Sequence, residues 1–260
     1  MDLNENVIVE KWDAGRPHEG KVFAAVFPHS DDFTIFAAGT MLKMIKEGYK
    51  GYFIRLTNDE KDSYDLTIGE TIYRIEIETQ MVAKLLGIEK VYDFNYKNHY
   101  LEYSQLTEIR HRLITLFRFL KIDTVISFDP WGHYEENPDH YLTGKFVEAA
   151  CWMAGRQLDL PELKDMGIMP HFVKEKYYVA RGPQLTNRII DISSVLDIKR
   201  SAIAKHVTPI DNMWKVYLED HPSETGGFKN KEEFMESSFI KVECMAIKNI
   251  ECYEKFHYSE

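Results

Sequence analysis

The stretch VFAAVFPHSDDFTIFAAGTM, residues 22–41, runs from an apolar segment directly into a cluster of ionisable side chains. The apolar segment ends at Pro28, His29 and the adjacent carboxylates Asp31 and Asp32 follow, and helix-like apolar spacing then resumes. Two neighbouring carboxylates repel each other unless a cation lies between them or they face different partners. The stretch therefore predicts a buried strand, a metal site at the end of that strand, and a helix.

The same alternation of short apolar runs and amphipathic stretches continues along the chain. Near-continuous apolar strands that alternate with helices are typical of a parallel sheet covered on both faces. We therefore expect an α/β fold with a doubly wound, mostly parallel sheet, in a single domain over residues 1–260. Strands are expected over 21–27, 51–57, 90–96, 123–129 and 174–180, helices over 35–48, 69–86, 104–119, 139–154 and 194–206, a surface loop over 219–233, and one or two helices over 231–255.

Composition restricts the partners and the location of the protein. The net charge of −10 argues against a broad surface for nucleic acid or an anionic membrane, since both require clustered Lys and Arg. Cys151, Cys244 and Cys252 form no CxxC pair, which predicts no disulfide framework and fits a reducing compartment. The first twenty residues lack a signal pattern and no apolar run has membrane-spanning length, so we expect a cytoplasmic protein.

Polar residues follow four of the expected strands. In doubly wound sheets, ligands bind beyond the carboxyl ends of the strands, so these residues should share one site. They are His29, Asp31 and Asp32 after the first strand, Asn58 and Asp59 after the second, the stretch NYKNHYLEY (95–103) after the third, and DPWGHYEENPDHY (129–141) after the fourth.

A catalytic zinc ion needs about three N or O ligands and one open position. His29 and Asp32 are three residues apart, and the loop after the fourth strand offers His133 and His140 as further ligands. Asp31 is then free to take a proton from an attacking water. The competing interpretation is that Asp31 and Asp32 only cap the following helix and that His140 lies on a helix surface.

Two segments resemble the signatures of the LmbE/PIG-L family of zinc-dependent N-deacetylases. AVFPHSDDFTIFAAGTMLK (25–43) is similar to the family segment written HPDDE, and DPWGHYEENPDHYLTG (129–144) to the segment written HPDH. The resemblance covers most of residues 21–206. It implies a Rossmann-like domain with helices on both faces, and hydrolysis of an N-acetyl or other N-acyl group from an amino sugar or small glycoconjugate, with a water at the metal as nucleophile.

The resemblance also implies residue roles. His29, Asp32 and His140 match the ligands of Zn2+, and Asp31 matches the general base. Arg74 matches a substrate-contacting arginine, although it is equally well spaced to pair with Glu70 or Glu78.

The chain departs from the family pattern at several positions. Ser30 replaces Pro, Phe33 replaces Glu, and Asn98 stands where many members have an Asp near the substrate. Asn137 replaces the first His of HPDH, which stabilises the oxyanion in the family. Here either Asn137 donates a neutral hydrogen bond or His133 takes over that role.

Several alternatives stay open from the sequence. A metal-dependent phosphoesterase also uses paired carboxylates, although it expects a second metal and more convergent Lys or Arg. A non-catalytic sugar-binding relative is the other alternative. The native metal could be zinc or iron, and a homo-oligomer is compatible with the sequence.

Overall fold

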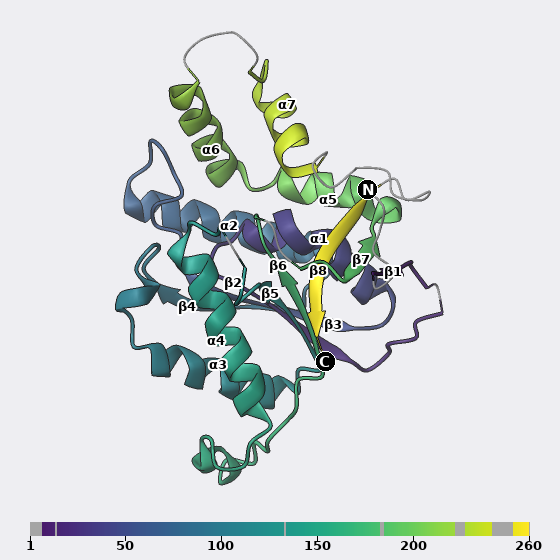
Figure 1. The fold of residues 1–260 in the computed structure, drawn as a ribbon. Helices are drawn as coiled ribbons and strands as arrows, with labels where there is room; N and C mark the ends of the chain where they lie inside the picture. The colour runs from purple at the N-terminus through teal and green to yellow at the C-terminus, as the bar shows by residue number, and fades with distance from the viewer. Residues whose placement is uncertain are drawn as a thin grey trace.

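A computed structural model describes residues 7–13, 15–132, 134–182, 185–221, 227–240 and 252–259. Within them, eight strands form one sheet in the order β1-β7-β8-β6-β5-β2-β3-β4 (Figure 1). The strands are β1 (Ile8–Glu10), β2 (Val22–Phe27), β3 (Lys50–Thr57), β4 (Lys90–Tyr96), β5 (Thr124–Phe128), β6 (Glu175–Val179), β7 (Arg188–Asp191) and β8 (Tyr253–Ser259).

The sheet is mostly parallel, as predicted. Strands β2 to β6 pair in parallel in the spatial order β4-β3-β2-β5-β6, and β1 pairs in parallel with β7. Strand β8 is antiparallel to both of its neighbours, β6 and β7. The chain first winds outward from β2 through β3 to β4 and then returns to β5, so the strand order reverses between β2 and β5.

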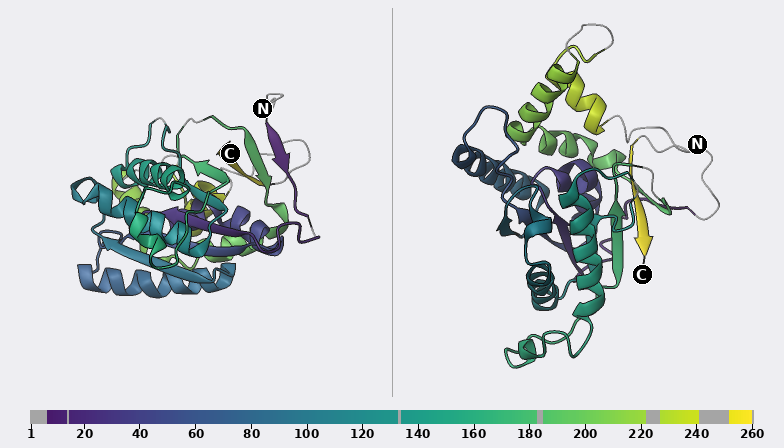
Figure 2. Two further views of the ribbon diagram at one scale, coloured as in Figure 1. Left: turned by 90° about the horizontal axis from the view of Figure 1, so that it is seen from below. Right: turned by 60° about the vertical axis from the view of Figure 1, so that its left-hand side comes forward.

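Helices cover both faces of the sheet (Figure 2). Along β2, Phe23, Ala25 and Phe27 contribute to the core with α1, α2 and α5, whereas Ala24 and Val26 contribute to the core with α3 and α4. Because side chains alternate across a strand, burial on both faces requires an uninterrupted apolar run. The helices are α1 (Asp32–Lys46), α2 (Ile68–Leu86), α3 (Leu106–Leu120), α4 (Pro138–Ala154), α5 (Leu196–Ile203), α6 (Val207–Asp220) and α7 (Lys231–Met235).

Local sequence fixes several helix ends. Thr67 and Glu70 form a capping box at the start of α2, and Gly87 ends the same helix in the left-handed conformation with φ of 80°. At α4, Asn137 is the N-cap and Pro138 occupies the first turn. These signals explain why α2 and α4 begin and end within one residue of their predicted bounds.

Three strands and one helix were not predicted. The elements without a sequence prediction are β1, β7 and α6, and the helix expected through residue 255 is wrong from Tyr253 onward, where β8 begins. The sequence does not indicate β8, because a charged residue such as Glu254 in this segment favours the prediction of an exposed helix face over that of a buried strand. In the structure Lys199 Nζ lies 2.8 Å from Glu254 Oε1, and both side chains are fully buried.

Two further sequence expectations bear on the environment of the protein. Cys151 is a buried free thiol, but Cys252 is disulfide-bonded, so the prediction of no disulfide framework needs this correction. Among the helices of the described residues, none is both long and apolar enough to cross a membrane.

Candidate metal centre

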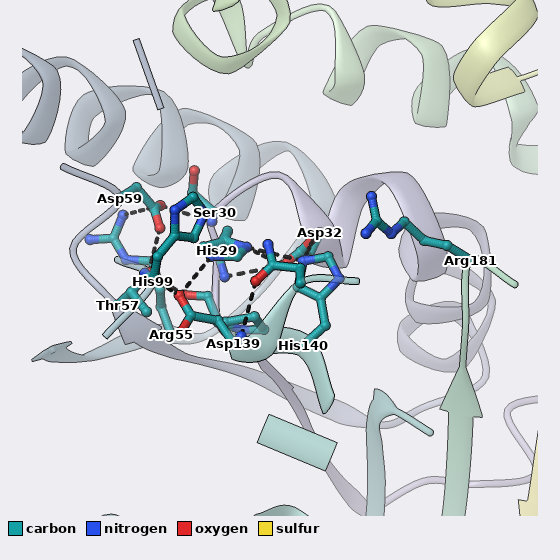
Figure 3. A network of polar contacts seen from close by, with 12 residues as sticks. His29, Ser30, Asp32, Arg55, Thr57, Asp59, His99, Asp139, His140 and Arg181 are labelled. Atoms are coloured by element: carbon teal, nitrogen blue, oxygen red, sulfur yellow. Dashed lines mark hydrogen bonds and ion pairs between the residues drawn. The ribbon is translucent and has the colours of Figure 1, made fainter. Parts of the chain in front are cut away.

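The residues predicted at the strand ends gather where the strand order reverses between β2 and β5 (Figure 3). His29 and Asp31 lie in the turn after β2, and Asp32 begins α1. His140 lies in the first turn of α4, which follows β5. Parallel strands that run side by side end at the same edge, so segments 111 residues apart in the chain meet here.

His29, Asp32 and His140 form a compact buried group with one potential ligand atom from each residue inside a span of 4.8 Å. Nε2 of His140 lies 3.2 Å from Nδ1 of His29 and 3.4 Å from Oδ1 of Asp32. Nδ1 of His29 lies 3.0 Å from Oδ2 of Asp32. The structure thus brings together all three predicted metal ligands.

These spacings fit a divalent ion with a mixed nitrogen and oxygen ligand set. Tetrahedral bonds of about 2.0–2.2 Å place neighbouring ligand atoms about 3.3–3.6 Å apart. The observed separations reach 3.4 Å, so only small movements are needed around an ion. Three protein ligands leave one position open, which is the arrangement of catalytic rather than structural sites.

Asp139 orients the first histidine of this group. Its Oδ2 lies 3.3 Å from Nε2 of His29 and accepts the backbone N–H of His99 at 2.6 Å. When the ring proton of His29 is on Nε2, the Nε2–H group donates a hydrogen bond to Asp139. The lone pair of Nδ1 then faces Asp32 and His140. A carboxylate behind a ligating histidine is a common means of fixing the tautomer and the ring.

Glu135 lies behind the second histidine. Its Oε1 is 3.2 Å from Nδ1 of His140, an ion-pair contact outside hydrogen-bond geometry, and 2.6 Å from a guanidinium nitrogen of Arg181. Burial alone would raise the pKa of Glu135, but His140 and Arg181 lower it to about 2. Glu135 is therefore a carboxylate that faces Nδ1 of His140, whereas Nε2 of the same ring faces His29 and Asp32.

Asp31 occupies the N-cap position of α1, yet its side chain makes no capping hydrogen bond. The side chain is mostly buried. Burial together with the carboxylates of Asp32 and Asp62 raises the pKa of Asp31 well above its ordinary value. The capping interpretation therefore does not account for Asp31, whose carboxyl group is suited to hold a proton beside the ligand set.

A second polar network supports the turn that carries His29. The backbone N–H of Ser30 donates to Oδ2 of Asp59 at 2.9 Å, and Arg55 lies 3.4 Å from the same oxygen. Thr57 Oγ1 contacts Oδ1 of Asp59 at 2.7 Å. The polar residues at the end of β3 thus position the turn after β2 and lie outside the ligand set.

The other predicted site residues have different surroundings. Asn137 is the N-cap of α4, three residues before His140, and its Oδ1 accepts the backbone N–H of Asp139 at 3.0 Å. Asn98 is fully buried, and neither polar atom of its side-chain amide has a hydrogen-bond partner in the described part of the chain. Arg74 is exposed on α2 near Glu70 and Glu78, and no described contact joins it to the ligand set. His133 lies outside the described residues.

Sequence reasoning gave no role to Glu135, Asp139, Arg181 or Asp62. Of these four, only Asp139 could have been predicted from the sequence, because it precedes His140 in the first turn of an expected helix. Arg181 and Asp62 carry no local signal, since only the tertiary fold brings them here. Burial and neighbouring carboxylates, against the opposing effect of His29, raise the pKa of Asp62 to about 7.

Comparison with known proteins agrees with this geometry. The family described as PIG-L: GlcNAc-PI de-N-acetylase matches residues 24–151. The chain is 29% identical over 209 residues to the diacetylchitobiose deacetylase of Thermococcus kodakarensis, covering 76% of this chain and 75% of that protein. It is 31% identical over 130 residues to a probable N-acetyl-alpha-D-glucosaminyl L-malate deacetylase 2 of Bacillus anthracis, covering 48% of this chain and 57% of that protein.

Solved structures extend the likeness at the level of the fold. The N,N'-diacetylchitobiose deacetylase of Pyrococcus horikoshii superposes with a TM-score of 0.73 and 24% identity, covering 95% of this chain and 87% of that one. The 4-carboxy-2-hydroxymuconate hydratase of Pseudomonas putida superposes with a TM-score of 0.68 and 20% identity, covering 92% and 96%. Proteins with this fold thus catalyse more than one reaction, so the residues of the site, and not the fold, have to indicate the activity.

Fold and site together define a doubly wound α/β protein with a His, Asp, His metal-type cluster at its switch point. Residues 24–151 form a PIG-L/LmbE family domain. The predicted resemblance is confirmed, and the predicted enzyme class, hydrolysis of N-acetyl amide bonds, is confirmed at the level of the deacetylase relatives.

Proposed function

We propose that this protein is a metal-dependent N-deacetylase that hydrolyses the acetamide of an N-acetylglucosamine-type sugar. The observation that carries the proposal is the placement of Asp31, an uncapped and mostly buried carboxyl group beside three convergent ligand side chains. The names of the matched family and of both relatives share an acetylated glucosamine unit, which supports this substrate class.

The proposed metal is zinc, held by His29, Asp32 and His140. When bound, such an ion polarises the amide carbonyl and lowers the pKa of water. Asp139 holds His29 from behind, and Glu135 lies against the far edge of His140, so both rings keep their orientation.

Asp31 is the proposed proton carrier. It accepts the proton of the attacking water and later delivers it to the nitrogen of the departing amine. Its raised pKa suits this task because a carboxylate with a raised pKa is a stronger base than an ordinary carboxylate.

Asn137 is the proposed donor to the carbonyl oxygen as negative charge develops there. Its Oδ1 accepts the N–H of Asp139, which leaves the amide NH2 free to donate. The alternative donor, His133, stays a prediction because it lies outside the described residues.

Asn98 is the proposed substrate contact, because its buried amide has no described partner and adjoins His99, whose backbone N–H bonds Asp139. Arg74 also stays a prediction as a substrate contact. We also propose a cytoplasmic location and a single domain over residues 1–260.

The phosphoesterase alternative fits the site less well. A two-metal phosphoesterase needs a second group of ligands near the first. Within residues 7–13, 15–132, 134–182, 185–221, 227–240 and 252–259, only the His29, Asp32 and His140 group has the spacing for a metal.

The decisive experiment is a screen for amine release from N-acetylglucosamine, N,N'-diacetylchitobiose and a generic acetanilide, with a phosphate ester and an enol hydratase substrate in parallel. We expect zinc-dependent amine release from the sugars and none from the ester. The Asp31→Asn variant is the matched control: it should keep its metal by elemental analysis and lose at least about 10²-fold in kcat. Turnover of the ester or hydratase substrate alone, or near-normal kcat in Asp31→Asn, would refute the proposal.

A further inference from the structure

The turn that carries His29 is held from both sides by residues at the end of β3 (Figure 3). On the side before His29, the carbonyl oxygen of Pro28 accepts the backbone N–H of Thr57 at 3.0 Å. On the side after it, the backbone N–H of Ser30 donates to Oδ2 of Asp59 at 2.9 Å. Both chain neighbours of His29 are therefore fixed by a segment that supplies none of the three proposed ligands.

Asp59 is held in this contact by its burial and by its backbone. The residue is fully buried, and its φ is 52°, a left-handed conformation that is uncommon for a residue with a Cβ atom. Such conformations persist where the surroundings hold them, and they gather at functional sites. Thr57 Oγ1 lies 2.7 Å from Oδ1 of Asp59, so both carboxylate oxygens have partners. Neither oxygen is free to turn away from Ser30 without losing a contact.

Arg55 supplies the positive charge that a buried carboxylate needs. Its Nη1 lies 3.4 Å from Oδ2 of Asp59, and its other two nitrogens contact Asp93 at 2.5 Å and Glu76 at 2.8 Å. Arg55 is itself only 2% exposed. The guanidinium thus keeps Asp59 ionised inside the protein, and a charged acceptor makes a stronger hydrogen bond to a backbone N–H than a neutral acceptor does.

Position 30 provides the donor for this contact. The family signature has Pro at this position, and Pro has no backbone N–H. Ser30 has the N–H, whereas its side-chain hydroxyl is buried without a hydrogen-bond partner in the described part of the chain. The backbone group of Ser30, and not its hydroxyl, is therefore the part that Asp59 holds.

We propose that Asp59 is a positioning residue that raises the affinity of the site for its metal ion. By holding the N–H of Ser30, it keeps the turn in the form that places His29 beside Asp32. Oδ2 of Asp32 lies 3.0 Å from Nδ1 of His29 and accepts the backbone N–H of the same residue at 3.1 Å. Because these ligand atoms are already together, binding needs little reorganisation. The inference rests on the metal site of the proposed function and not on the substrate.

Titration of the metal-free protein with Zn2+ against a competing chelator tests this role. Asp59→Ala removes the acceptor and should raise the dissociation constant about 10- to 100-fold, the usual cost of losing an outer partner of a metal site. Asp59→Asn keeps an acceptor oxygen and should recover part of this loss. Ile189→Ala, in the separate apolar cluster at β7, is the matched control: it should lower the melting temperature and leave the dissociation constant unchanged.

A double-mutant cycle at position 30 tests the hydrogen bond itself. Ser30→Ala keeps the N–H and should leave the dissociation constant within about twofold of wild type. Ser30→Pro removes the N–H, so in that background Asp59→Ala should have no further effect on the dissociation constant, whatever affinity the proline ring itself gives.

Three outcomes overturn the proposal: an unchanged affinity for Zn2+ in Asp59→Ala, an equal loss of affinity in Ile189→Ala, and the same loss from Asp59→Ala with Ser or Pro at position 30. His140→Ala distinguishes this failure from failure of the metal site. If His140→Ala binds Zn2+ as tightly as wild type, the metal site and the role of Asp59 are both wrong. If His140→Ala loses affinity and Asp59→Ala does not, only the role of Asp59 is wrong.

Discussion

At the scale of single residues, the proposed site depends on side chains that serve both the backbone and the proposed chemistry. Asn137 shows this most clearly, because one atom of its amide caps α4 and the other is free to donate. If the proposed role is correct, a substitution that removes the whole side chain combines a loss of helix stability with a loss of catalysis. Variants that separate the two effects are needed.

We expect Asn137→Ser to keep the cap and lose the donor, because Ser caps helices about as well as Asn but its hydroxyl is shorter. Its kcat should fall about 10²-fold with an unchanged melting temperature and metal content. Asn137→Ala should show the same loss of rate and also lose about 1 kcal/mol of stability. Full activity in Asn137→Ser would mean that another group, such as His133, stabilises the oxyanion.

The ligand set was predictable from the sequence because its members follow strands in a regular alternation. His29, Asp32 and His140 each stand directly after an apolar run or at a helix start, where strand ends converge. Arg181 and Glu135 illustrate what the sequence does not reveal. Their contact joins the loop after β6 to the loop before α4, and a pair 46 residues apart has no periodic pattern.

At the scale of elements, His206 ties α6 to α1. Its Nε2 lies 2.9 Å from Thr34 Oγ1, and its Nδ1 is buried without a hydrogen-bond partner. Burial, which outweighs the opposite pull of Asp32 and is reinforced by Arg55, lowers the pKa of His206 to about 3. The ring is thus neutral in the folded protein throughout the mildly acidic range.

This histidine should make stability depend on pH. In the unfolded chain His206 titrates near pH 6.5, so between about pH 6.5 and pH 3 the unfolded state binds a proton that the folded state does not. Stability therefore falls as pH drops through this window, by up to about 1.4 kcal/mol per pH unit. In urea titrations from pH 7 to pH 4, His206→Gln should show a shallower fall than wild type, and parallel curves would exclude this role.

The elements that sequence reasoning predicted correctly are those with a periodic apolar pattern and a clear end signal. Helix α2 has both, with its capping box and Gly87. Strand β1 has only three residues and β7 four, which is too short for a pattern to stand out. Strand β8 escaped prediction because the partner of Glu254 lies 55 residues away in α5.

At the scale of the whole molecule, Glu254 and Lys199 connect the sheet to the helical layer. The carboxylate of Glu254 also accepts the backbone N–H groups of Gly39 and Thr40 in α1, at 2.9 Å and 2.8 Å. One buried ion pair therefore joins β8, α5 and α1. Such pairs contribute little when complete, but removing one partner leaves a buried charge without compensation.

We expect Glu254→Gln to lower the free energy of unfolding by about 3–5 kcal/mol, because the buried ammonium of Lys199 loses the carboxylate 2.8 Å away and the N–H groups of Gly39 and Thr40 lose a charged acceptor. The double variant Glu254→Gln with Lys199→Met should recover part of this loss, since the buried charge is then absent. Urea unfolding followed by circular dichroism measures both values. A single variant as stable as wild type would show that water reaches this pair.

The position of β8 has a consequence for how the protein is made. Synthesis proceeds from the N-terminus, and early segments begin to fold as they leave the ribosome. Strands β2 to β6 can pair as soon as residue 179 has emerged, because each neighbour is already present. Strands β7 and β1 cannot join them, because residues 253–259 have to fill the place between β6 and β7. A nascent chain therefore carries two separate pieces of sheet with open edges until β8 has emerged, and during that interval its exposed strand edges are open to aggregation.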